Sequence, residues 1–149
     1  MNSQKPNIED QYKTMLILWA ALLMSQFLFV LLLFLTRTKL FTFEFSQPIT
    51  GNSASMTLGF AVAAVTAVLF SFAFRKRLNE RAVAAQDTGQ VQSGLIIALA
   101  LCEASSLFGL TLAFAFDYQY FFLWIGLGVL GMILHFPKRD ELHAASYKK

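Results

Sequence analysis

Apolar residues along the chain gather into four long segments separated by short polar stretches. Three of these segments contain no Asp, Glu, Lys or Arg and one contains only Glu103; the segments are residues 15–35, 54–74, 95–116 and 120–136. A helix needs about 20 apolar residues to cross a bilayer core. Backbone groups in lipid must also be satisfied within the chain, which favours helices. The pattern predicts an all-α integral membrane bundle of four transmembrane helices.

The predicted membrane domain therefore covers residues 15–136, between an amino-terminal segment, 1–14, and a basic tail, 137–149. In the stretch after the first span, Phe41, Phe43 and Phe45 alternate with polar residues before Pro48 and Gly51. This period favours a short strand or an extended segment on the membrane surface. The polar residues 75–90 are expected to form the middle loop. The short stretch 117–119 predicts a tight antiparallel turn.

Composition supports the membrane assignment and limits the chemistry. The chain is 56% apolar and 14% charged, against roughly 45–50% and about 25% in soluble domains. The excess of three positive charges is spread over the ends and one loop, so nucleic acid is not an expected partner. One cysteine, Cys102, permits neither an intrachain disulfide nor a cysteine-based metal site.

The distribution of basic residues predicts the orientation. Four spans place both termini and the middle loop on one side, and twelve Lys and Arg are available to decide which side this is. Only Arg37 and Lys39 lie in the opposite loops. Positive residues are retained in the cytoplasm, so both termini are expected there. The expected location is a bacterial inner membrane.

Glu103 is the residue inside the spans that could carry chemistry. A charge at mid-bilayer costs about 2.5–3.5 kcal/mol or more on insertion scales, and no Lys or Arg lies within a span to pair with it. One interpretation is a carboxyl that takes up and releases a proton. The other is a permanently protonated packing residue, bonded to a neighbouring helix through Ser105, Ser106, Thr66 or Gln26.

Small residues recur at helical intervals in the second and third spans. Such residues let neighbouring helices approach closely, and the predicted packing positions are Gly59, Ala63, Ala67, Ser71, Ala100, Ala104 and Gly109. Beyond these and Glu103, the chain has no catalytic constellation, no phosphate-binding loop and no spaced metal ligands. No cofactor or metal is expected, and enzymatic activity is left open.

The stretch from Gln90 to Phe114 resembles the carboxyl-terminal helix of the c subunit, or proteolipid, of rotary ATP synthases. Ala100-Leu101-Cys102-Glu103-Ala104 and Phe108-Gly109-Leu110 stand where that family has its small-apolar-carboxylate-Ala centre and its aromatic-Gly-Leu step. The resemblance covers a hairpin of residues 54–116. It implies that Glu103 is the ion-carrying carboxyl and that the hairpin turn is cytoplasmic. The family's glycine repeat and its Arg-Gln/Asn-Pro turn are missing here.

Two functions follow as hypotheses. The first is a small subunit of a larger, proton-translocating assembly that works through Glu103, with lipid and other membrane subunits or copies of itself as partners. The alternative is a non-catalytic accessory subunit that packs by helix-helix contacts. A small-molecule carrier is the least supported, because few polar residues are available to line a path.

The charge distribution generates a topology prediction. A reporter fused after Lys149 is expected to be active only in a form that reports the cytoplasm, because ten of the twelve basic residues lie on the side assigned to the termini. Activity of a form that reports the opposite side would overturn the four-span map.

Overall fold

The computed structural model describes residues 7–42, 48–51 and 54–146 of the chain. These residues form five α-helices, α1 (Ile8–Thr36), α2 (Ala54–Ala85), α3 (Thr88–Phe116), α4 (Phe121–Leu134) and α5 (Arg139–Ser146), and a 3-10 helix, η1 (Thr38–Phe41). The described part contains no strand. The all-α fold expected from the apolar pattern is thus confirmed.

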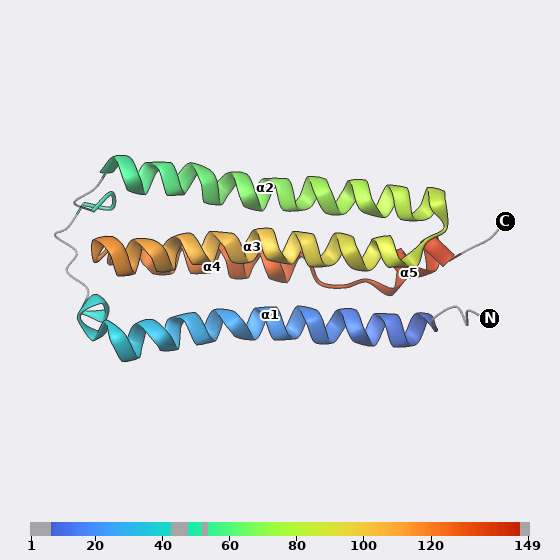
Figure 1. Cartoon of the computed structure of the whole chain (residues 1–149), viewed down its shortest axis with the longest axis horizontal. Coiled ribbons are helices and arrows are strands. Elements are labelled where there is room, and N and C mark those ends of the chain that lie inside the picture. Colours follow the sequence, from blue (N-terminus) through green and yellow to red (C-terminus); the bar gives the residue numbers. More distant parts are fainter. Residues whose placement is uncertain (1–6, 43–47, 52–53, 147–149) are drawn as a thin grey trace.

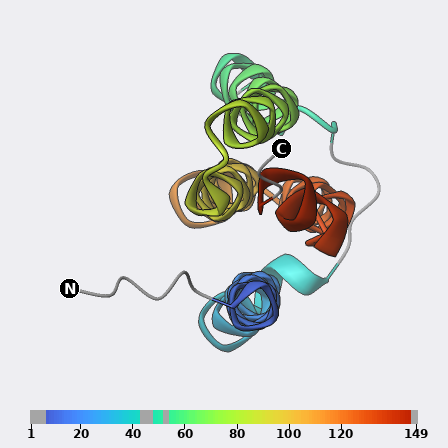
Figure 2. The ribbon, with the colours of Figure 1, turned by 90° about the vertical axis from the view of Figure 1, so that its right-hand side faces the viewer.

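The four longer helices lie side by side as a bundle (Figure 1). Seen along its length, α3 and α4 form the centre, and α1 and α2 lie on opposite sides of this pair (Figure 2). The start of α1 and the short helix α5 lie at the same end (Figure 1). We call this the basic end, because the second half of α2 brings Arg75, Lys76, Arg77 and Arg81 there.

Three helices run well beyond the apolar segments that predicted them. Helix α1 begins at Ile8, where the Asn7 side chain accepts a hydrogen bond from the Glu9 amide, and α3 begins at Thr88, where Asp87 caps the Gly89 amide. Such caps satisfy the first free amides of a helix and so set its start. The prediction that residues 75–90 form the middle loop is therefore wrong. Residues 75–85 and 88–90 are helical, and only Gln86 and Asp87 lie between α2 and α3.

The connections on the opposite side are partly as expected. Asp117 adopts a left-handed conformation, with φ of 48°, and residues 117–120 separate α3 from α4, so the tight turn is confirmed. Phe41 lies in η1 rather than in an extended segment, which corrects the prediction at that residue. Phe43 and Phe45 lie outside the described residues.

The number of membrane-crossing helices depends on α4. Helices α1, α2 and α3 are each long and apolar enough to cross a membrane, judged by length and composition. Helix α4 has 14 residues and spans only about 21 Å, short of the roughly 30 Å core. Together with α5, from which it is bent by 48°, it passes the same test, so the count is three, or four if this bent pair forms one span.

The central helices α3 and α4 meet at glycines. A side chain added at Gly109 would lie 2.6 Å from Cβ of Trp124 and 2.9 Å from the carbonyl oxygen of Phe121, and one added at Gly131 would lie 2.6 Å from Sγ of Cys102. At Gly128 an added Cβ would lie 2.7 Å from the Cys102 carbonyl oxygen. These distances leave no space for a methyl group, so the two backbones touch.

Ion pairs close both ends of the bundle. At the basic end Arg139 lies 3.3 Å from Glu9, joining α5 to the start of α1, and Arg75 lies 2.9 Å from Glu141, joining α2 to α5. At the other end Arg37 lies 2.6 Å from Asp117. Between these ends the sides of the bundle are apolar, as lipid contact requires.

The helix contact at Gly128 generates a stability prediction. Gly128→Ala is expected to lower the free energy of unfolding by about 1–3 kcal/mol, the usual cost of overpacking, because α4 must move away from the Cys102 carbonyl. Unfolding of the purified chain in mixed micelles measures this change. Gly126→Ala is the matched control on the same helix, since nothing lies within 4 Å of its added Cβ. Equal effects of the two substitutions would contradict the close contact.

Candidate functional site

Glu103 lies near the middle of the 29 residues of α3 and is half-buried. One of its carboxyl oxygens, Oε1, lies 2.7 Å from the hydroxyl of Ser25 on α1. No ion pair of the described residues includes Glu103, since the three that occur are the pairs at the two ends of the bundle. The carboxyl therefore has a neutral hydroxyl as its partner within the bundle.

The hydroxyl of Ser25 has two oxygen neighbours and one proton. Its Oγ lies 2.7 Å from the Leu22 carbonyl oxygen on its own helix and 2.7 Å from Glu103 Oε1. When Ser25 donates to Leu22, the contact with Glu103 is a hydrogen bond only if a protonated Glu103 donates. When Ser25 donates to Glu103, the carboxyl can be ionised. Rotation of one hydroxyl thus accommodates both protonation states with the heavy atoms in place.

Gln26 adjoins this site. Its side chain is buried, and its Nε2 donates to the Ser25 hydroxyl over 3.5 Å. Its Oε1 is buried without a hydrogen-bond partner among the described residues. The expected bond from Gln26 across to another helix is therefore not formed, because the amide turns to its neighbour on α1. A polar cluster of Ser25, Gln26 and Glu103 results.

Ser25 was missed in the sequence, where the partners considered for Glu103 were Ser105, Ser106, Thr66 and Gln26. Ser105 instead donates to the Trp124 carbonyl oxygen over 3.2 Å, and Thr66 is exposed. The available signal was that Ser25 and Gln26 are the only polar residues of the apolar segment 15–35. It could not show that α1, rather than α2, covers the carboxyl.

The small residues predicted to pack are distributed unevenly in the bundle. On α2 only Ser71 of the four is fully buried; Ala63 and Ala67 are half-buried, and an added Cβ at Gly59 would meet nothing within 4 Å. The buried face of α2 is rotated by about one residue from the predicted face. Its buried residues are Thr57, Ala64, Val68, Ser71, Arg75 and Ala82. Small residues occur at both 63 and 64, so the sequence could not distinguish the two faces.

On α3 the three expected packing positions also differ. Gly109 is buried against Trp124 and Phe121, Ala104 is half-buried, and Ala100 is exposed. Packing against another helix of this chain is therefore not seen at Ala100 or at Gly59. The exposed small residues leave room on the outer face of α2 for a helix of another chain.

A second polar cluster joins α2, α3 and the end of α4. The Ser71 hydroxyl donates to the Val68 carbonyl oxygen over 2.6 Å, and its oxygen lies 2.9 Å from His135 Nε2 and 3.6 Å from Cys102 Sγ. If Ser71 donates to Val68, then His135 Nε2 and Cys102 are the donors; in the other tautomer of His135, Nε2 accepts the Ser71 proton. In both arrangements His135 joins the end of α4 to α2.

His135, just after α4, is only 1% exposed. Its ring also contacts that of Phe72 edge to face, with 4.3 Å between centroids. The described residues contain no group of three or more His, Cys, Asp or Glu side chains that could hold a metal ion.

No protein-family model, no curated protein and no solved structure matches the chain. The similarity to the proteolipid hairpin therefore rests on the residues around Glu103 alone.

The Ser25–Glu103 contact generates a prediction for a double-mutant cycle. Ser25→Ala and Glu103→Ala are expected to show a coupling of roughly 0.6 kcal/mol, and no more than about 1.7, the range of hydrogen bonds between helices in membranes. Unfolding in mixed micelles gives the four free energies that the cycle needs.

The matched control replaces Ser25→Ala with Ser93→Ala. Ser93 is exposed and bonds the Gly89 carbonyl of its own helix over 3.0 Å, so its coupling to Glu103→Ala should be absent. A coupling of the same size in both cycles would mean that the contact between Ser25 and Glu103 adds nothing specific to the free energy of unfolding.

Proposed function

We propose that this chain is a small integral membrane subunit of a larger assembly, in which Glu103 takes up and releases a proton. The observation that carries the proposal is the carboxyl itself, held at the middle of a long apolar helix without a cation. A Ser25 hydroxyl that serves both protonation states supports it. Ionisable groups inside membrane spans are expensive and mark ion pathways.

The similarity to the proteolipid is consistent with the arrangement of α2 and α3. These helices form an antiparallel hairpin with a two-residue connection at the basic end, and Glu103 lies near the middle of the second helix. The proposal includes four spans, with residues 120–136, which contain α4, as the fourth. It also includes a bacterial inner membrane as the location and cytoplasmic termini, the latter on the basis of the charge distribution.

A proton suits this site better than a sodium ion. Ala104 follows the carboxylate where sodium-binding proteolipids have Ser or Thr, and α2 contains no Gln or Glu in its apolar segment 54–74. The Ser25 hydroxyl supplies one oxygen, whereas an alkali cation needs several oxygen ligands converging on one point. Proton transfer needs only the hydrogen bond.

A second candidate function is supported by the outer face of α2. Gly59 is exposed with open space around it, and Leu58, Val62 and Leu69 beside it are more than 60% exposed. An apolar face with small residues can pack against a helix of another subunit. In this alternative the chain is an accessory subunit and Glu103 is a permanently protonated packing residue.

A hydrophobic carbodiimide tests whether Glu103 is reachable as a protonated acid, a state that both functions include. This reagent modifies a protonated acid in an apolar setting, so labelling of Glu103 is expected near neutral pH. Mass spectrometry of the labelled chain locates the modification. Glu103→Gln should remove it, and Glu80→Gln, at an exposed acid on α2, should leave it intact.

Proton movement in vesicles of the native membrane is the second measurement. Glu103→Gln is expected to lower it to the level of vesicles that lack the chain, because the amide keeps the shape but cannot ionise. Glu80→Gln should retain full movement. Undiminished proton movement in the Glu103→Gln vesicles would refute the proposal and favour the accessory subunit.

A further inference from the structure

A groove at the basic end of the bundle is separate from the Glu103 site. It has a volume of about 340 Å³ and lies between α2 and the bend that joins α4 to α5. Phe72, Lys76 and Glu80 line it from α2, and Leu134 and Lys138 line it from the bend. The groove thus lies where the apolar segments of two helices end.

The charges of the groove are unequally paired. Arg75 is 8% exposed, and it donates to Glu141 over 2.9 Å and to the Phe136 carbonyl oxygen over 3.2 Å. Its charge is therefore neutralised by a residue of the protein. Lys76 and Lys138 are exposed, and neither forms an ion pair within the described ranges. With Glu80 as the remaining acid, the free charge of the groove is positive.

The membrane side of the same groove is apolar. Phe72 and Leu134 line it and are 40% and 67% exposed, although both belong to segments that carry the chain through the membrane. A ligand that uses both parts must be amphipathic, with a negative head beside the lysines and a hydrocarbon chain beside the phenylalanine and leucine.

We infer that this groove binds the headgroup of an anionic phospholipid. The phosphate lies between Lys76 and Lys138, and an acyl chain lies along Phe72 and Leu134. Basic pockets between membrane helices at the interface are suited to such headgroups, and lysine stems can follow apolar surface while their ammonium groups reach the phosphate. A free phosphate ion would use the lysines but not the apolar wall.

The test uses the purified full chain in a neutral detergent. Thermal unfolding is followed while phosphatidylglycerol, phosphatidylcholine with the same acyl chains, or inorganic phosphate is added. Phosphatidylglycerol is expected to raise the unfolding temperature in a saturable way and at lower concentration than phosphatidylcholine. Inorganic phosphate should not compete. If inorganic phosphate alone gives the same stabilisation, the groove is a phosphate site and the lipid proposal is wrong.

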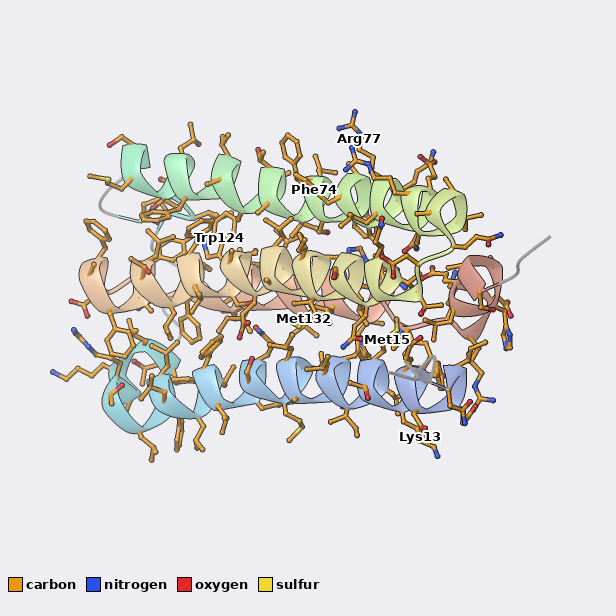
Figure 3. All side chains as sticks on the ribbon, turned by 45° about the vertical axis from the view of Figure 1, so that its right-hand side comes forward. Lys13, Met15, Phe74, Arg77, Trp124 and Met132 are labelled. Atoms are coloured by element: carbon orange, nitrogen blue, oxygen red, sulfur yellow. The ribbon has the colours of Figure 1, made fainter. Side chains whose placement is uncertain are left out.

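Replacing both lysines is the decisive change. The double variant Lys76→Gln, Lys138→Gln is expected to bind phosphatidylglycerol roughly 30-fold more weakly, since each cation near a lipid surface contributes about a fivefold factor. The control double variant Lys13→Gln, Arg77→Gln removes the same charge from side chains that point away from the other helices (Figure 3). An equal loss in the control would show diffuse attraction and overturn the site.

A third variant is expected to bind phosphatidylglycerol more tightly, a result that a poorly folded variant would not give. Glu80→Gln removes the acid that repels the phosphate and is expected to tighten phosphatidylglycerol binding about fivefold. No change, or weaker binding, in this variant would place the headgroup elsewhere. None of the substituted residues contacts Glu103 or Ser25, so these results are independent of proton movement.

Discussion

The backbone contact between α3 and α4 is the interaction on which the rest of the bundle depends. Glycines 109, 128 and 131 let the two helices touch, and no side chain larger than hydrogen fits there. Because successive helical residues point about 100° apart, Cys102 faces the α4 contact at Gly131 while Glu103 faces α1. The same contact places His135, at the end of α4, beside Ser71 of α2. Wider separation of α3 and α4 would move His135 away from Ser71.

Two small hydrogen-bonded sets hold several of the polar groups inside the bundle, which lowers the cost of placing them where water is absent. Ser71 serves three neighbours with one hydroxyl, and Ser25 serves two. The difference lies in their partners. The Ser71 set contains no carboxyl. The Ser25 set contains Glu103, the carboxyl on which the proposed proton uptake rests.

The two proposed sites lie on different sides of α3. Glu103 faces α1 near the middle of the bundle, whereas the lipid groove lies between α2 and the α4–α5 bend at the basic end. The ion pair between Arg75 and Glu141 holds α5 against α2 and keeps Arg75 from neutralising a ligand. A bound headgroup would therefore hold the bend between α4 and α5 against α2.

The sequence by itself determined the helical class, the tight turn after α3 and Glu103 as the exceptional residue, because these follow from local apolarity and from one charge in a long apolar run. It did not determine the helix ends, which capping by Asn7 and Asp87 extends into polar segments. Nor could it identify Ser25 as the partner of Glu103. Small residues are spread around α2 and α3, so only the packing of whole helices decides which face is buried and which helix covers the carboxyl.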